Sequence, residues 1–394
     1  MNMILTPKRL AGSIAAIPSK SQAHRLLLLA ALAEGETEIA ISAMGQDIEA
    51  TAHCLRSLGA NIEYCGGRCT VRPIEAPKAA PLDVGESGST LRFLLPVVCA
   101  LGAKCSFRLH GKLPQRPMEA LVSELHRHGA EIWQDGNEIS VSGKLTGEDF
   151  RLPGNISSQF LSGILLALPL LGGGSLTAEG PIESRGYLDL TVDALRKFGA
   201  EVTEENRKFT VSGTLRSPGA LCVEGDWSNA AFWLVADRLG SNITVTGLDP
   251  SSRQADRAIV DLLDCREIDC AGVPDLAPAL AVLAAFTPGQ TRFTGAARLR
   301  LKESDRIAAC TAMVRALGAK AEERPDGFTV WGSAALPGGT VDSFGDHRIA
   351  MAAAIAGTRA PVKILNAQAV EKSYPAFWSD YARLGGAVAW EDAI

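Results

Sequence analysis

The sequence predicts an α/β protein of two lobes, each containing three copies of one folding unit. Two repeated helix patterns and a globular composition lead to this prediction. The chain has 394 residues, of which 46% are hydrophobic and 21% charged. This length suffices for two or three domains with their own cores, and the composition excludes disordered and fibrous classes of protein.

The first repeat is an amphipathic helix that ends in Gly-Ala and is followed by a strand. The pair stands at Gly59-Ala60, Gly129-Ala130 and Gly199-Ala200, so the step is 70 residues. It returns as Gly318-Ala319 and, with glycine in second place, as Gly385-Gly386. Glycine after the last helical turn suits a left-handed cap, and the short strands that follow predict a hairpin at the end of each unit.

The second repeat is a helix that is apolar on nearly all sides and must therefore be buried. It occurs over residues 25–32, 90–101, 159–171, 230–235, 276–286 and 349–356. The starts lie near residues 20, 89, 158, 228, 276 and 346, which are 69 or 70 residues apart except for one interval of 48. The fourth of six units is thus shortened, and its segment Leu262–Arg266 lacks the Gly-Ala ending.

Each full unit is predicted to have the order strand, buried helix, strand, amphipathic helix and hairpin, or βαβαββ. Six units divide into two groups of three, which predicts an N-terminal lobe over residues 18–226 and a C-terminal lobe over residues 227–394. Similar paired lobes would leave a cleft between them, a common place for a ligand.

The charge balance argues against nucleic acid as a partner. Lysine and arginine number 39 against 44 aspartates and glutamates, a net charge of −5, so the chain has no overall positive field for polyanions. The nine cysteines are an odd number and are not densely spaced, which favours reduced thiols over a disulfide scaffold. The start lacks a secretory pattern, and the apolar runs are shorter than the roughly 20 residues of a membrane span. We therefore expect a cytoplasmic protein that does not contact a membrane.

Polar residues open all six buried helices. Capping accounts for serine and aspartate there, but not for Lys20, Arg25 and Arg348, because a helix N-terminus disfavours cations. Further cations stand around the predicted amphipathic helices, at Arg116, Lys302, Arg306 and Lys372. Backbone amides, hydroxyls and guanidinium groups together favour a receptor for more than one anionic group.

Acid and base candidates occur in the same openings. Asp275 is the better base candidate, with a plain helix cap as its alternative, while Glu303 and His347 stand beside cations. The sequence has no Walker loop, no nucleophile elbow and no carboxylate cluster typical of a divalent metal. We expect no cofactor and no metal.

Six motifs in order resemble the family of 5-enolpyruvylshikimate-3-phosphate synthases, over about residues 8–385. They are residues 20–25, 88–92, 115–117, 157–159, 302–306 and 346–348, which read KSQAHR, GSTLR, QRP, SSQ, KESDR and DHR. The resemblance implies an inside-out α/β barrel of two lobes, in which residues 1–17 cross into the C-terminal lobe. It also implies transfer of the enolpyruvyl group of phosphoenolpyruvate to the 5-hydroxyl of shikimate 3-phosphate, with release of phosphate.

The same resemblance implies the site residues. Those for shikimate 3-phosphate would be Lys20, Ser21, Arg25, Ser157, Ser158, Gln159, Ser184, Asp275 and Lys302. Those for phosphoenolpyruvate would be Lys20, Gly88, Arg116, Gln159, Arg306, Arg348 and Lys372. Asp275 would take the hydroxyl proton, and Glu303 with Lys20 or Lys372 would manage protonation at C3. The two small molecules would be the only partners of a monomer.

Three positions depart from the family pattern, and two other functions compete. Glu86 stands where Asn is common, Ser373 replaces a frequent Thr, and Arg298 stands where some members have Asn. The sister enolpyruvyl transferase acting on UDP-N-acetylglucosamine usually has a reactive cysteine in the loop that is here His110–Gln115, which has none. A carrier of phosphorylated metabolites would need no acid or base groups.

Overall fold

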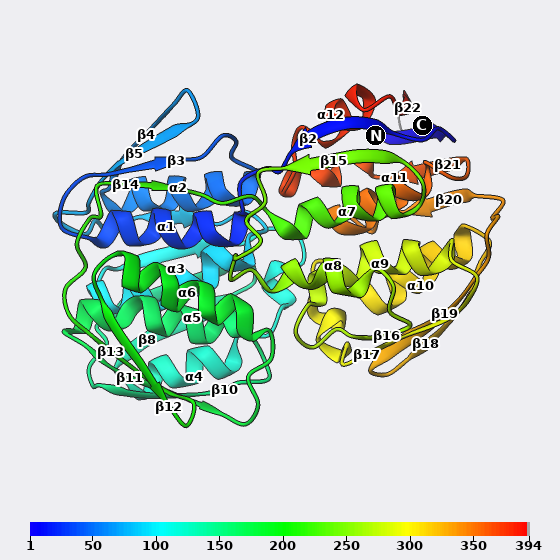
Figure 1. Ribbon diagram of the computed structural model, residues 1–394. Helices are drawn as coiled ribbons and strands as arrows, with labels where there is room; N and C mark the ends of the chain where they lie inside the picture. Colours follow the sequence, from blue (N-terminus) through cyan, green and yellow to red (C-terminus); the bar gives the residue numbers. More distant parts are fainter. Residues whose placement is uncertain (392–394) are drawn as a thin grey trace. The chain divides into compact units, whose positions relative to one another are not determined.

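The computed structural model describes residues 1–391, which fall into two compact units (Figure 1). The N-terminal unit is Pro18–Val223, and the C-terminal unit combines Met1–Ile17 with the chain from Glu224. The sequence placed this division after residue 226, close to the Val223–Glu224 junction.

The N-terminal unit has six α-helices and twelve strands in the described chain. The helices are α1 (Lys20–Leu32), α2 (Gln46–Leu58), α3 (Gly88–Leu101), α4 (Glu119–Arg127), α5 (Ser158–Ala167) and α6 (Arg185–Lys197), with 3₁₀ turns η1 (Leu113–Gln115) and η2 (Leu168–Leu171). The strands are β3 (Thr37–Ala40), β4 (Asn61–Cys65), β5 (Arg68–Arg72), β6 (Pro81–Asp83), β7 (Cys105–Arg108), β8 (Ala130–Asp135), β9 (Glu138–Gly143), β10 (Asp149–Pro153), β11 (Gly174–Glu179), β12 (Glu201–Glu205), β13 (Lys208–Ser212) and β14 (Ala220–Cys222).

These strands form three four-stranded sheets of one pattern, with orders β14-β3-β5-β4, β6-β7-β9-β8 and β10-β11-β13-β12. In each sheet the first two strands are parallel and the closing hairpin is antiparallel. The three copies predicted from the repeats are therefore present. The first sheet takes its outer strand, β14, from the far end of the unit.

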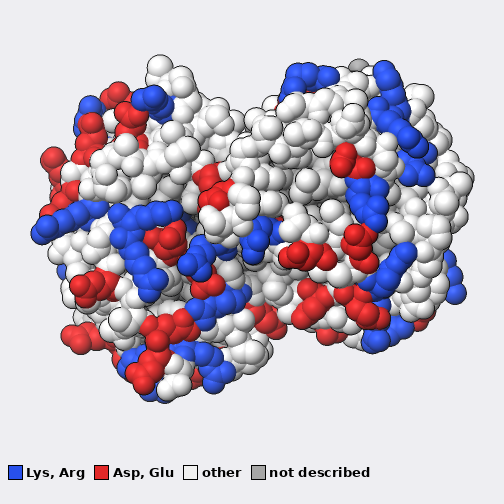
Figure 2. All heavy atoms as spheres, in the orientation of Figure 1, with Lys and Arg blue, Asp and Glu red and all other residues white. Residues whose placement is uncertain are grey.

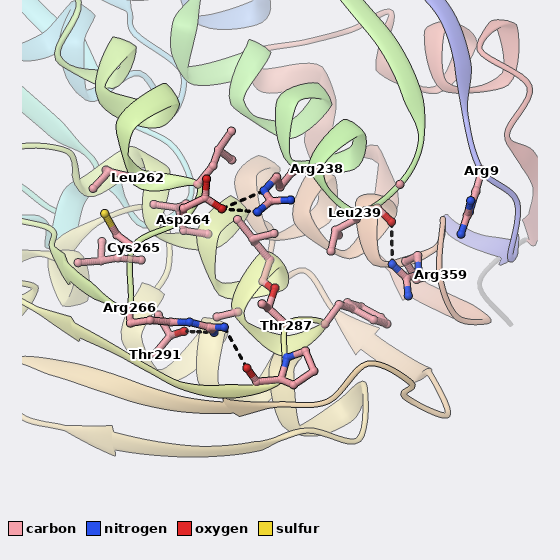
Figure 3. A pocket seen from close by; sticks show the side chains of 18 residues that line it. Arg9, Arg238, Leu239, Leu262, Asp264, Cys265, Arg266, Thr287, Thr291 and Arg359 are labelled. Atoms are coloured by element: carbon pink, nitrogen blue, oxygen red, sulfur yellow. Dashed lines mark hydrogen bonds and ion pairs between the residues drawn. The ribbon is translucent and has the colours of Figure 1, made fainter.

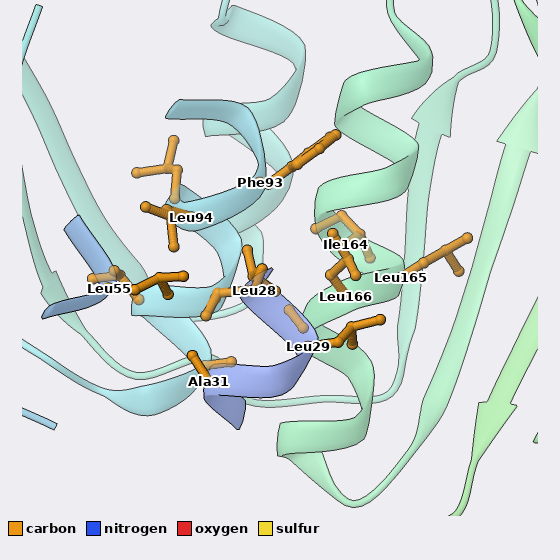
Figure 4. Close-up of a cluster of buried hydrophobic side chains, with 14 of the residues drawn as sticks. Leu28, Leu29, Ala31, Leu55, Phe93, Leu94, Ile164, Leu165 and Leu166 are labelled. Atoms are coloured by element: carbon orange, nitrogen blue, oxygen red, sulfur yellow. The ribbon is translucent and has the colours of Figure 1, made fainter. Parts of the chain in front are cut away.

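The core of this unit is made by the apolar helices α1, α3 and α5, whose residues are almost all buried. Figure 4 shows Leu28 and Leu29 of α1 packed among Leu94 of α3 and Ile164 and Leu166 of α5. Because their bodies fill the core, only their polar first turns remain for chemistry.

The C-terminal unit repeats this plan with changes at both ends. Its helices are α7 (Trp227–Arg238), α8 (Ile259–Leu262), α9 (Ala277–Ala285), α10 (Arg306–Ala316), α11 (His347–Ala356) and α12 (Phe377–Arg383), with 3₁₀ turns η3 (Ala255–Ala258), η4 (Pro274–Leu276), η5 (Ala297–Leu301) and η6 (Ala367–Lys372). Its strands are β1 (Asn2–Thr6), β2 (Ala11–Ala15), β15 (Asn242–Thr246), β16 (Glu267–Asp269), β17 (Gly289–Thr294), β18 (Lys320–Arg324), β19 (Gly327–Gly332), β20 (Gly339–Asp342), β21 (Val362–Leu365) and β22 (Ala387–Glu391).

In the part of the C-terminal unit that the structure describes, only the middle copy, the sheet β16-β17-β19-β18, has its own hairpin. The fourth unit has a two-stranded parallel sheet of β15 and β2, and α8 runs into β16 without a hairpin in the described chain. In the last sheet, β20-β21-β1-β22, the N-terminal strand β1 lies where the other copies have a hairpin strand. The predicted hairpin after Gly385-Gly386 is therefore wrong, because the partner of β22 comes from the other end of the chain.

Candidate active site

In the N-terminal unit, the predicted residues open the buried helices. Ser19 caps α1 by accepting a hydrogen bond from the amide of Gln22, and Lys20 follows as the first helical residue. The Lys20 Nζ lies 2.7 Å from Asp47 Oδ2 at the start of α2, and both side chains are largely buried. Ser21 stands next to Lys20 and is half-buried. The pairing with Asp47 offsets the unfavourable position of this cation at a helix N-terminus.

Arg25 lies one turn further into α1 and is 2% exposed. Its guanidinium donates to Thr191 Oγ1 at 2.7 Å, to the Tyr187 carbonyl at 2.8 Å and to the Ser21 carbonyl at 2.5 Å. It also lies 4.8 Å above the ring of Phe93. All these partners are neutral, and burial lowers the pKa of Arg25 to about 9. An anion within reach of Arg25 would compensate this buried charge.

Gly88, the first residue of α3, contacts two guanidinium groups. A Cβ on Gly88 would lie 2.8 Å from Nη1 of Arg116 and 3.2 Å from Nη1 of Arg92. Arg92 donates to Gln159 Oε1 at 2.7 Å, and Gln159 Nε2 donates to Ser89 Oγ at 2.8 Å. The absent side chain of Gly88 thus leaves room for these two arginines.

The remaining predicted residues of this unit lie at the starts of α5 and α6. Ser157 caps α5 through the amide of Gln159, and Ser158 is buried beside it. Ser184 precedes α6 in a left-handed conformation with φ 53° and is also buried. A left-handed non-glycine residue is uncommon, and such backbone geometry concentrates at functional sites.

In the C-terminal unit, three predicted cations converge on the predicted base. Asp275 lies in η4 at the entrance to α9. Its Oδ1 accepts from Arg306 Nη1 at 2.8 Å and lies 3.5 Å from Lys302 Nζ, and its Oδ2 accepts from Arg348 Nη2 at 2.9 Å. Asp275 is not the N-cap residue of η4 or of α9, since Val273 and Leu276 occupy those positions.

Arg306 is the most buried cation of this group, at 1% exposure. It also donates through Nε to Asp346 Oδ2 at 2.8 Å and through Nη2 to Glu303 Oε2 at 2.8 Å. Burial alone would lower the pKa of Arg306, but the charges of Asp346, Glu303 and Asp275 raise it well above its usual value. Arg306 is therefore a permanent cation held by three carboxylates.

Lys302 and Lys372 complete the predicted cations of this unit. Burial lowers the pKa of Lys302, although the nearby charge of Asp275 works in the opposite direction. Lys372 Nζ donates to the carbonyl of Gly345 at 2.9 Å, just before α11. We expected Lys372 at the start of a helix, but it ends η6 and so lies where a helix favours cations.

Five residues without a predicted role also contact the predicted site residues: Asp346, Arg92, Asp47, Ser162 and Thr191. Asp346 is fully buried, caps α11 through the amide of Arg348 and accepts from Arg306 and Ser304. Ser162 and Thr191 bond each other at 2.8 Å beneath Arg25. A hydroxyl inside an otherwise apolar helix is the signal that could have revealed Ser162.

Two further residues that the sequence singled out are His347 and Glu86. His347 is buried next to Asp346, and Glu86 is an exposed side chain that lies against Gly111. Within residues 1–391, no group of His, Cys, Asp or Glu is arranged to hold a metal ion, and no helix is long and apolar enough to cross a bilayer. Acidic and basic side chains are interspersed on the face that Figure 2 shows.

One family model and several known proteins match this chain along almost its whole length. The model of the family described as EPSP synthase (3-phosphoshikimate 1-carboxyvinyltransferase) matches residues 4–265 and 261–381. The 3-phosphoshikimate 1-carboxyvinyltransferase of Clostridium novyi is 40% identical, with 98% of each chain covered, and that of Methanocorpusculum labreanum is 35% identical, with 98% of this chain and 99% of the relative covered.

Solved structures match equally fully. EPSP synthase from Acinetobacter baumannii superposes with a TM-score of 0.81 at 28% identity, covering 99% of this chain and 100% of that one. The enolpyruvyl transferase NikO from Streptomyces tendae, at 19% identity and a TM-score of 0.76 over 98% of each chain, shares the fold. On the full-length family match and the 40% identity, this chain belongs to the EPSP synthase (3-phosphoshikimate 1-carboxyvinyltransferase) family.

Proposed function

We propose that this chain transfers the enolpyruvyl group of phosphoenolpyruvate to the 5-hydroxyl of shikimate 3-phosphate and releases inorganic phosphate. Membership of the family supports the reaction. The observation that carries the assignment of residues is the convergence of Arg306, Arg348 and Lys302, from three separate elements, on Asp275. Three cations gathered on one carboxylate supply the positive charge that a polyanionic substrate needs, and they leave Asp275 ionised.

Shikimate 3-phosphate would be bound mainly by the N-terminal unit. Arg25 has a buried guanidinium with neutral partners, which the phosphate of this substrate would compensate. Residues at the first turns of α1, α5 and α6 would supply further donors, and two C-terminal residues would complete the set. These residues are Lys20, Ser21, Ser157, Ser158, Gln159, Ser184, Asp275 and Lys302.

Phosphoenolpyruvate would bind to guanidinium groups, two of which, those of Arg306 and Arg348, contact carboxylates in this structure. Its phosphate and carboxylate match the planar donor pairs of Arg116, Arg306 and Arg348. When Arg348 turns its N–H groups to this substrate, one oxygen of Asp275 becomes available to the 5-hydroxyl. The remaining residues proposed to contact phosphoenolpyruvate are Lys20, Gly88, Gln159 and Lys372.

The proposed chemistry is an addition followed by an elimination. In the first step, Asp275 accepts the proton of the 5-hydroxyl while the oxygen of that hydroxyl bonds to C2 of phosphoenolpyruvate. C3 receives a proton, and Glu303 together with Lys20 or Lys372 would direct this transfer. In the second step, C3 loses a proton, the C2–C3 double bond returns and phosphate leaves. Arg116, Arg306 and Arg348 would stabilise the departing phosphate, since fixed cations act most strongly where charge develops.

The sister reaction on UDP-N-acetylglucosamine is the alternative. It is disfavoured because the loop His110–Gln115 has no cysteine and because the named relatives act on 3-phosphoshikimate. We also propose that the protein works in the cytoplasm as a monomer, and that the shikimate-type substrate and phosphoenolpyruvate are its partners.

A phosphate-release assay tests this proposal. The purified chain, incubated with phosphoenolpyruvate and shikimate 3-phosphate in buffer without added metal, is expected to release phosphate and form the enolpyruvyl ether, detected by mass spectrometry. Incubation with UDP-N-acetylglucosamine in place of shikimate 3-phosphate is the control. Turnover of the UDP-sugar alone would move the assignment to the sister reaction, and turnover of neither would refute both.

A further inference from the structure

A cavity lies wholly within the C-terminal unit, apart from the residues assigned above. It has a volume of about 410 Å³ and is lined by the ends of α7 and α9, the segment Leu262–Arg266, and single residues from the N-terminal segment and from the turn after α11. The cavity forms where the shortened fourth unit has no hairpin. In the neighbouring full copy, α9 packs against β19 of its own hairpin.

One wall of this cavity is apolar. Leu280, Leu283 and Phe286, at the end of α9, are each less than 7% exposed overall yet line the space. The guanidinium of Arg359 lies 5.8 Å from the ring centroid of Phe286. This wall provides room for a flat apolar group beneath a cation.

The rest of the cavity lining is rich in positive charge. It contains one aspartate, Asp264, and four arginines, Arg9, Arg238, Arg266 and Arg359. Figure 3 shows Arg9 and Arg359 on one side of the cavity and Asp264, Cys265 and Arg266 on the other. Asp264 is already paired with Arg238 through Nε at 3.1 Å and through Nη2. The positive charge of the other three is not offset by a carboxylate lining the cavity.

Helix capping explains part of this arrangement but not all of it. Arg359 donates to the carbonyl of Leu239, the C-cap of α7, at 2.7 Å, and Arg266 donates to the carbonyl of Pro288, in the turn after α9, at 2.9 Å. These bonds also fix the two guanidiniums at the rim. Arg9 makes no hydrogen bond or ion pair among residues 1–391 and instead packs on Gly240, where a Cβ would lie 3.5 Å from Cζ of Arg9.

We propose that this cavity is a binding site for a small organic anion, a phosphate or carboxylate joined to one ring-sized apolar group. The anion would contact Arg9 and Arg359, which lie on the same side of the cavity, and the apolar group would lie on Phe286 and Leu280. This pairing satisfies both walls at once, which neither inorganic phosphate nor a neutral hydrocarbon does.

Cys265 supplies a readout, because this residue lines the cavity and is exposed. Cys65 and Cys222 are exposed in the N-terminal unit and serve as internal controls, while the other six cysteines are buried. Iodoacetamide labelling of the full chain, followed residue by residue by peptide mass spectrometry, is expected to show that phenyl phosphate slows labelling of Cys265 alone. Inorganic phosphate should need a concentration roughly tenfold higher for the same protection, because it lacks the buried ring.

Two variants make the test specific. Arg9→Gln is expected to raise the phenyl phosphate concentration for half protection about fivefold, as for loss of one exposed ion pair. Arg207→Gln removes a similarly exposed arginine from a hairpin of the N-terminal unit and should change nothing. Equal protection of all three exposed cysteines, no protection of Cys265, or equal effects of the two variants would overturn the proposal. The readout is thiol protection rather than turnover, so its failure is distinct from failure of the proposed function.

Discussion

Asp275 contacts two of the arginines that we propose bind phosphoenolpyruvate. Its two oxygens accept hydrogen bonds from Arg306 and Arg348, each shorter than 3 Å. As long as both bonds persist, the carboxylate is a poor acceptor for a hydroxyl proton. Binding of phosphoenolpyruvate to these arginines would therefore also prepare the base.

The first prediction concerns this residue. Asp275→Asn keeps the shape of the side chain but removes its basicity, so kcat should fall by roughly 10²- to 10⁴-fold. Steady-state phosphate release measures it. Asp135→Asn makes the same change at an exposed site in the N-terminal unit and should retain full activity. An Asp275→Asn enzyme as fast as the Asp135→Asn control would show that Asp275 is not the base.

The second prediction concerns Arg25. Arg25→Gln should weaken binding of shikimate 3-phosphate by about 10- to 100-fold, because hydrogen bonds to charged groups contribute about 1.5–3 kcal/mol. Titration calorimetry measures the affinity. Arg25→Lys retains the charge but not the planar set of donors that reaches Thr191 and Tyr187 together. Its affinity for shikimate 3-phosphate should therefore lie between those of the unaltered chain and Arg25→Gln.

Circular dichroism of the ligand-free variants provides the control for folding. Shikimate 3-phosphate should raise the melting temperature of the unaltered chain and not that of Arg25→Gln. An Arg25→Gln protein that folds and binds this ligand with unchanged affinity would remove Arg25 from the site.

At the residue scale, sequence could predict which cations lie in the first turns of buried helices but not what they contact. Lys20, Arg25 and Arg348 were recognisable because helix N-terminal turns disfavour cations. Their partners, such as Asp47 for Lys20 and Thr191 for Arg25, come from other helices at separations of 27 and 166 residues. Such pairings depend on tertiary packing, about which local patterns carry no information.

At the element scale, α10 and α11 are joined by one buried carboxylate. Asp346 accepts the amide of Arg348 at the start of α11 and the guanidinium of Arg306 at the start of α10. Burial alone would raise the pKa of Asp346, but the charge of Arg306 lowers it below its ordinary value. The folded state therefore favours the ionised form of Asp346.

The third prediction follows from that pKa. A carboxyl group with a lower pKa in the folded protein stabilises it above the unfolded pKa of about 3.9, and this contribution disappears as the pH falls through the folded pKa. Asp346→Asn retains a capping oxygen but loses the ion pair, which should cost about 3–5 kcal/mol at pH 7. Urea unfolding followed by circular dichroism measures the cost.

The pH series separates this cause from a packing defect. The difference in unfolding free energy between the unaltered chain and Asp346→Asn should be constant from pH 7 to pH 5 and shrink below about pH 4. A difference that stays the same down to pH 3 would mean that the carboxylate charge is irrelevant.

Element types and their repeat were predictable because burial leaves a strong pattern. The helices α1, α3 and α5 begin at Lys20, Gly88 and Ser158, close to the predicted starts near residues 20, 89 and 158. The boundary near Lys372 was harder to predict, because Ser373 and Pro375 are residue types that occur at helix starts, whereas α12 begins only at Phe377. Capping residues that also occur in turns do not distinguish the two.

At the scale of the whole molecule, the six-copy plan was evident in the sequence, but the completion of incomplete copies was not. The sheet of the shortened fourth unit takes β2 from the N-terminal segment, and the last sheet takes β1 from it. Strand pairing at a separation of more than 200 residues leaves no local periodicity. The placement of residues 1–17 in the sequence analysis came from the family resemblance alone.

The fourth prediction tests whether the C-terminal unit needs the N-terminal strands β1 and β2 to fold. Residues 18–223 form three complete sheets by themselves, so this fragment should fold alone and unfold cooperatively in urea. Residues 224–394 lack β1, the strand between β21 and β22, and β2, the partner of β15, so this fragment should remain largely unfolded. Far-ultraviolet circular dichroism distinguishes the two outcomes.

Restoring the missing strands provides the matched control. In the antiparallel pair of β1 and β22, Asn2 lies opposite Glu391, so a chain that continues from residue 394 into residues 1–17 would turn this pair into a hairpin like those of the complete copies. The fragment 224–394 extended in this way should regain helical signal and a cooperative transition. The same fragment extended by a scrambled version of residues 1–17 should not. If 224–394 folds equally well without any extension, the two N-terminal strands are dispensable and the sheets tolerate open edges. If only the genuine extension restores folding, the C-terminal unit depends on strands made at the very start of synthesis, before any of its helices exist.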